Sequence, residues 1–129
     1  MAAPATLFLT TQRTLTDCAI AALAMVLGLG YEQVRERTIK LIKNFEEGLT
    51  SREIARVAKS FKRSLKVIDK MDDDTVNELV GLMVVRRGNV YHALVLFHGV
   101  LYDPSDGTLW EPSAYFHTTK RTPFRLLVP

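Results

Sequence analysis

The spacing of hydrophobic positions predicts helices in the first half of the chain. Residues 19–27 are apolar without interruption, so a helix over residues 17–27, ending at Gly28, would be buried on every face. Residues 31–45 carry apolar side chains at helical spacing, which predicts a second, amphipathic helix. Thr50 and Glu53 match the capping box that opens a helix, and we expect a third helix after them.

Extended spacing replaces helical spacing in the second half of the chain. Three aspartates at residues 72–74 are expected to cap a short helix rather than to bind a metal, because no calcium-loop pattern surrounds them. Strands separated by turns are predicted at residues 64–68, 82–85, 91–97, 100–103 and 124–128. Helices followed by an antiparallel sheet indicate the α+β class, and we expect one domain over residues 1–129.

Composition narrows the class of protein further. Of the 129 residues, 47% are hydrophobic and 24% are charged, which is normal for a globular protein, and the net charge is only +3. One cysteine excludes an internal disulfide, and the N-terminus lacks the pattern of a signal peptide. The apolar run at residues 19–27 is too short to span a bilayer. We therefore expect a cytoplasmic protein without a membrane span.

The single cysteine, Cys18, lies where a nucleophile would be activated. It follows Thr16 and Asp17, two residues that favour helix N-caps, and it should occupy the first turn of the buried helix. The partial positive charge at a helix N-terminus favours a thiolate over a thiol. Gln12, six residues upstream, offers a side-chain amide that can donate a hydrogen bond near the sulfur. A nucleophile of this kind needs a base from elsewhere in the chain.

A histidine and an aspartate in the second half supply that base. His92 opens a predicted strand and Asp103 ends the strand that returns beside it. In an antiparallel hairpin these two positions lie at the same end of the sheet, with a stagger of a few residues allowed. Asp103 would then orient one imidazole nitrogen while the other faces Cys18, as in a catalytic triad. Gln12 and the backbone N–H of Cys18 would bind the oxyanion.

These residues resemble a known family. The segment from Gln12 through Asp17-Cys18-Ala19 to Gly28 resembles the start of the C39 group of papain-like cysteine peptidases, the bacteriocin-processing type. His92-Ala-Leu-Val-Leu and Val-Leu-Tyr-Asp103-Pro resemble its histidine and aspartate blocks. The resemblance implies a papain-like fold, with an N-terminal helical lobe that carries the cysteine and a C-terminal antiparallel sheet lobe that carries histidine and aspartate.

The same resemblance implies residue roles and a substrate class. By it, Gln12 is the oxyanion residue, Cys18 the nucleophile, His92 the general base and acid, and Asp103 the residue that orients His92. It implies no cofactor, a polypeptide substrate and cleavage of an amide bond through an acyl-enzyme. Most relatives cut leader peptides after a double glycine and are fused to exporters. The family usually has glycine at the position that Ala19 occupies here.

Other functions remain open at this point. Enzymes of this shape also act as deamidases and acyltransferases. A catalytically idle papain-like fold could serve as a protein-binding module. A basic nucleic-acid-binding domain is a third alternative, because Arg52, Arg56 and Lys59 share one helix face, but a solvated helix face explains them better and no recognised motif accompanies them. A metal site is disfavoured because no paired ligand spacing exists, and the sequence predicts no oligomeric state.

Overall fold

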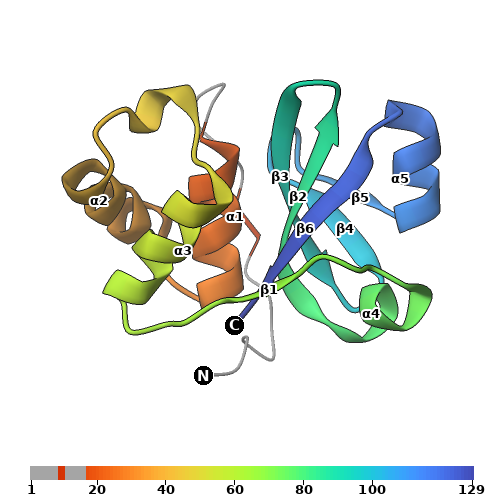
Figure 1. Ribbon diagram of the computed structural model, residues 1–129, viewed down its shortest axis with the longest axis horizontal. Coiled ribbons are helices and arrows are strands. Elements are labelled where there is room, and N and C mark those ends of the chain that lie inside the picture. Colours follow the sequence, from red (N-terminus) through yellow and green to blue (C-terminus); the bar gives the residue numbers. More distant parts are fainter. Residues whose placement is uncertain (1–8, 11–16) are drawn as a thin grey trace.

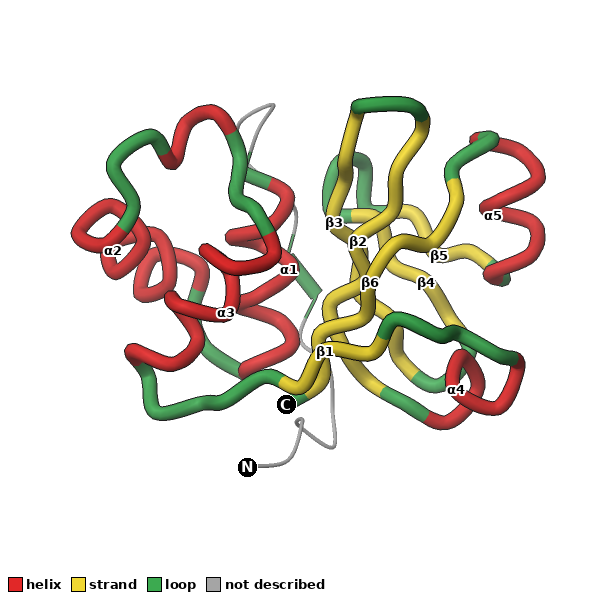
Figure 2. Tube along the Cα trace, in the orientation of Figure 1, coloured by secondary structure: helices red, strands yellow, loops and turns green. Residues whose placement is uncertain are grey.

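Two lobes lie side by side in the computed structural model, which describes residues 9, 10 and 17–129 (Figure 1). One lobe is helical and the other is a sheet with two short helices on its outer side, as the colouring by secondary structure also shows (Figure 2). The helical lobe contains α1 (Cys18–Leu27), α2 (Tyr31–Leu41), a 3₁₀ turn (Phe45–Glu47) and α3 (Ser51–Ser60). The α+β class and the order of the two lobes, helices before sheet, are therefore confirmed.

The sheet lobe is a six-stranded sheet in which every neighbouring pair is antiparallel. Its strands are β1 (Lys66–Ile68), β2 (Val80–Arg87), β3 (Val90–Phe97), β4 (Val100–Asp103), β5 (Thr108–Trp110) and β6 (Thr122–Val128). They follow the order β1-β6-β2-β3-β4-β5, so the last strand of the chain inserts beside the central hairpin of β2 and β3. Two helices, α4 (Asp73–Glu78) and α5 (Pro112–Thr119), belong to this lobe.

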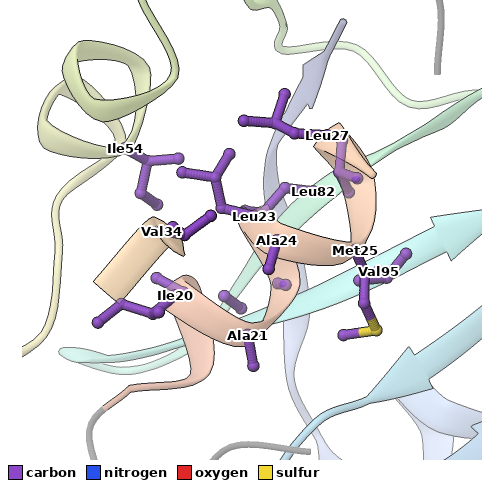
Figure 3. Close-up of a cluster of buried hydrophobic side chains, with 14 of the residues drawn as sticks. Ile20, Ala21, Leu23, Ala24, Met25, Leu27, Val34, Ile54, Leu82 and Val95 are labelled. Carbon is purple, nitrogen blue, oxygen red and sulfur yellow. The ribbon is translucent and has the colours of Figure 1, made fainter. Parts of the chain in front are cut away.

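Alternating side chains of the sheet build two hydrophobic clusters, one on each face. The first contains the buried residues of α1 with Val34 of α2, Ile54 of α3, and Leu82 and Val95 of the sheet (Figure 3). The second contains Met83, Val85, Leu94, Leu96, Leu101, Tyr115 and Leu126. Because nine consecutive residues of α1 are buried, this helix is fixed between the other helices and the sheet.

Helix boundaries follow the local capping signals where such signals exist. Thr50 Oγ1 accepts from the N–H of Glu53, and Glu53 Oε1 accepts from the N–H of Thr50, which confirms the predicted capping box. Asp72 caps α4 by accepting from the N–H of Thr75, at 2.8 Å from Oδ1, and this bond lowers the pKa of the Asp72 carboxyl. The capping interpretation of the aspartates therefore holds for Asp72.

The second helix is shorter than its periodicity predicts. It ends at Leu41, and Ile42 has extended backbone angles of φ −117° and ψ 116°. The prediction of a helix to residue 45 was wrong because the chain turns at Ile42 toward α3. In this conformation the Ile42 side chain is only 3% exposed. The burial of this apolar side chain favours the extended backbone over a continued helix.

None of the helices in the described part of the chain combines the length and apolar character that a membrane span requires.

Candidate active site

Cys18 is the first residue of α1, and its side chain is half-buried. Asp17 occupies the N-cap position, as predicted, but its carboxylate does not accept the capping hydrogen bond that the prediction included. The carboxylate instead accepts a hydrogen bond from the Tyr31 hydroxyl, and both side chains are buried. Thr16, the other predicted cap residue, lies outside the described residues, as does Gln12. This hydrogen bond connects Asp17, the chain neighbour of Cys18, to α2 of the same lobe.

His92 and Asp103 meet although they are not direct partners in the sheet. The β3–β4 ladder pairs Val95 with Tyr102, so His92 and Asp103 lie beyond its end with an offset of two residues. Their side chains bridge this stagger: His92 Nε2 is 2.7 Å from Asp103 Oδ1. Both are largely withdrawn from solvent, with side-chain exposures of 12% and 8%. The predicted proximity of the two residues at one end of the hairpin is therefore what the structure shows.

Cys18 and His92 line the same cleft, and both Cys18 and Asp103 change the proton affinity of the imidazole. Burial lowers the pKa of His92, but hydrogen bonds with Asp103 and Cys18, and the negative charge of both, outweigh burial and raise the pKa to about 9. Because Nε2 faces Asp103, it is Nδ1 that remains for the sulfur. The imidazole therefore lies between the Asp103 carboxylate and the Cys18 sulfur, and it retains its proton at neutral pH.

Ser105 completes the surroundings of the carboxylate. Its backbone N–H and its hydroxyl donate to Asp103 Oδ1, at 2.9 and 2.7 Å. Burial raises the pKa of Asp103, whereas the bonds from His92 and Ser105 outweigh burial and hold that pKa below its usual value. Sequence reasoning missed Ser105, although an aspartate in a turn often accepts from the backbone N–H two residues on, as Asp103 does here.

A cleft of about 740 Å³ runs over Cys18 and His92, and residues of both lobes line it. The helical side of this cleft includes Glu47, Leu49 and Ile54, and the sheet side includes Tyr91 and Phe124. Tyr91 and Phe124 contact each other edge to face, with ring centroids 5.3 Å apart. The lining is mixed, with apolar side chains beside polar ones such as Glu47, Asn89 and Arg125.

Within the described residues, no group of three or more His, Cys, Asp or Glu side chains is arranged to hold a metal ion.

Comparison with known proteins agrees with this arrangement. The model of the peptidase C39 family matches residues 7–118. One similar solved structure is that of a double glycine motif protease from an AMS/PCAT transporter in complex with the leader peptide. It has 17% sequence identity and a TM-score of 0.66, and the match covers 98% of this chain and 92% of that chain.

A second similar structure is the peptidase domain of Streptococcus ComA, a bifunctional ABC transporter involved in a quorum sensing pathway. Its identity is 20% and its TM-score is 0.60, with 96% of this chain and 99% of that chain covered. No curated protein sequence matches the chain. Since the family model spans most of the sequence and the fold agrees, the chain belongs to the peptidase C39 family and is a cysteine peptidase with a papain-like fold.

Proposed function

We propose that the protein cleaves a peptide bond through an acyl-enzyme on Cys18, with His92 as general base and acid and Asp103 as the residue that orients His92. The observation that carries this proposal is the position of the His92 imidazole, which lines the same cleft as Cys18 and lies 2.7 Å from Asp103. Nucleophile, base and orienting carboxylate in this order are what acyl transfer by a cysteine enzyme requires.

The reaction would begin with the proton held on His92 and the negative charge on the Cys18 sulfur. The sulfur attacks the carbonyl carbon of the substrate, and the imidazolium then gives its proton to the leaving amine. Neutral His92 next takes a proton from water, whose oxygen attacks the thioester and releases the new carboxyl terminus. Asp103 accepts from Nε2 throughout, which keeps Nδ1 directed at the reacting atoms.

The oxyanion of each tetrahedral intermediate needs hydrogen-bond donors. We assign this role to the side-chain amide of Gln12 and to the backbone N–H of Cys18. Cys18 begins α1, and the first N–H groups of a helix have no acceptor within the helix. The partial positive charge at this end of the helix favours the negative oxygen further.

The substrate we propose is an extended polypeptide segment bound in the cleft between the lobes. The volume of the cleft, about 740 Å³, and its lining from both lobes leave room for a polypeptide segment. One similar structure contains a leader peptide, and a leader segment with a double glycine is therefore the first substrate to test. We further propose that residues 1–129 act as one peptidase domain in the cytoplasm.

The decisive experiment compares the protein with Cys18→Ala on synthetic leader peptides with and without a double glycine, with products identified by mass. We expect cleavage by the parent protein and a loss of at least about 10³-fold in kcat/KM for Cys18→Ala. Thermal unfolding checks that the variant is folded. Cleavage by folded Cys18→Ala would refute the proposal, and a product of unchanged chain length would indicate a deamidase or acyltransferase instead.

A binding module with an idle triad makes a different prediction for thiol chemistry. If Cys18 and His92 form a working pair, iodoacetamide alkylates Cys18 faster in the parent protein than in His92→Ala at neutral pH. His98→Ala is the matched control, because its imidazole contacts the Glu78 carbonyl rather than the candidate site. Equal alkylation rates in the parent protein and His92→Ala, with peptide bound but not cleaved, would favour the binding module.

A further inference from the structure

Asp103 has a second cationic neighbour besides His92. Its Oδ1 atom accepts from His92 and Ser105, whereas its Oδ2 atom lies 4.0 Å from Arg121 Nη1. Arg121 follows α5 and lines a second cleft, of about 560 Å³, that opens on Asp103 and Ser105. Arg121 is absent from the residues that line the cleft over Cys18, so it reaches the candidate active site through the carboxylate alone.

The guanidinium is held in place by a buried partner. Arg121 Nη1 donates to the hydroxyl of Tyr115 at 2.7 Å, and Tyr115 is only 1% exposed. The backbone also contributes, because Lys120 adopts a left-handed conformation at the end of α5 and the N–H of Arg121 donates to Thr119 Oγ1. A side chain that is 31% exposed yet anchored in this way presents a fixed positive charge.

We propose that Arg121 is a positioning residue of the candidate active site, which acts through Asp103 to keep that carboxylate ionised and to limit how tightly His92 holds its proton. The inference rests on the roles proposed above for His92 and Asp103. Charges then alternate along one row, from the Arg121 guanidinium through the Asp103 carboxylate and the His92 imidazolium to the Cys18 sulfur. In such a row each charge favours its neighbours and opposes the next but one.

Other titratable groups lie near this row of charges and could change the pKa of His92. The sulfur of Cys18 faces His92 from α1, and Asp106 and Arg87 line the second cleft from the loop after β4 and from β2. Burial raises the pKa of Tyr102, and the negative charges of Asp103 and Asp106 raise it further. Burial raises the pKa of Tyr115 too, although Arg121 partly opposes this. Both phenols are therefore neutral at the pH where His92 titrates, and they add no charge to the row.

The sign of the effect follows from the charge of Arg121. Removing a positive charge makes every nearby group easier to protonate, so the imidazolium of His92 becomes more stable and gives up its proton less readily. We expect Arg121→Gln to raise the pKa of His92 by about half a unit, the shift expected for one charge at a partly exposed site. We also expect a several-fold lower kcat with KM unchanged, because Arg121 does not line the substrate cleft.

The test is an NMR titration of the His92 imidazole in the intact protein, without substrate, for Arg121→Gln and the charge-conserving Arg121→Lys. Arg87→Gln is the matched control, since it removes a positive charge from the same cleft but, among the described residues, Arg87 forms no ion pair with Asp103. Only Arg121→Gln should show the upward shift, and about 1 M salt should reduce it, because the Debye length falls to about 3 Å.

An unchanged or lower His92 pKa in folded Arg121→Gln, or an equal shift in Arg87→Gln, would overturn the inference. If Arg121→Gln does not fold, Tyr115→Phe provides the second variant, because it removes the acceptor that holds the guanidinium but keeps the charge. A smaller upward shift of the His92 pKa is expected there, and its absence counts against the inference. The titration needs no turnover, so its outcome is independent of whether Cys18 cleaves peptides.

Discussion

Asp103→Asn tests the electrostatic link between Asp103 and His92, since it removes the charge while conserving the side-chain shape. The pKa of His92 rises from 6.5 to about 9 in the folded protein. That difference of about 2.5 units corresponds to about 3 kcal/mol of preference for the imidazolium. Among the interactions that raise the pKa, the hydrogen bond with Asp103 is the largest. We therefore expect Asp103→Asn to lower the pKa of His92 by about 1 unit or more.

The same shift makes the free energy of unfolding depend on pH. Since the pKa of His92 is higher in the folded state, its stabilisation is fully present below 6.5 and is lost as the pH rises through about 9. Because Cys18 also affects the pKa of His92, the comparison is best made between Cys18→Ala and the double variant Cys18→Ala/Asp103→Asn. All other side chains are common to both proteins, so their contributions cancel in the difference.

Urea unfolding of this pair, measured from about pH 6 to about pH 10, provides the assay. We expect Cys18→Ala to be more stable than the double variant at low pH. The difference between their free energies of unfolding should narrow by about 1–2 kcal/mol over this range. This is less than the roughly 3 kcal/mol of the whole pKa shift, because the Cys18 contribution is absent. Bonds from Ser105 to Asp103 add an offset that does not change with pH here. A difference that stays constant or widens with pH would refute the link between Asp103 and His92.

Two further substitutions test the packing around the site by urea unfolding. Tyr31→Phe removes the hydroxyl that donates to buried Asp17, and it should cost about 1–3 kcal/mol; no loss of stability would show that this bond does not fix the start of α1. Gly81→Ala would place a Cβ 2.6 Å from the Leu127 carbonyl oxygen and should lower the free energy of unfolding by about 1–3 kcal/mol. Gly30→Ala is the control, because its Cβ would meet no neighbouring group within 4 Å, and it should lower that free energy by less. Equal losses at the two glycines would contradict the importance of the close contact.

Local signals in the sequence predicted most of the elements and failed where tertiary packing decides. The capping box at Thr50 fixes the start of α3 because its hydrogen bonds span only three residues. Strand β4 has the predicted limits because turns lie on both sides of it. The end of α2 was missed because the burial of Ile42 depends on contacts with residues distant in the sequence.

In the candidate site too, the sequence predicted the contacts that local geometry determines and missed those that depend on tertiary packing. His92 and Asp103 could be paired from the sequence because hairpin geometry brings the two ends together, even across a two-residue stagger. The proximity of Arg121 to Asp103 could not be predicted from the sequence, because it depends on how Tyr115 of α5 packs against the outer face of the sheet. Gln12 lies outside the described residues, so its predicted role rests on the sequence alone.

The relative position of Cys18 and His92 depends on how the two lobes pack, because the residues lie on different lobes. Cys18 is the first residue of a helix whose remaining residues are buried, so its backbone cannot shift without displacing α1 from the core. His92 lies near the start of β3, whose residue Val95 packs against that same core. The hydrophobic cluster between the lobes therefore stabilises the fold and also fixes the geometry of the pair. A core substitution that lets α1 shift would separate the sulfur from the imidazole before the protein unfolds.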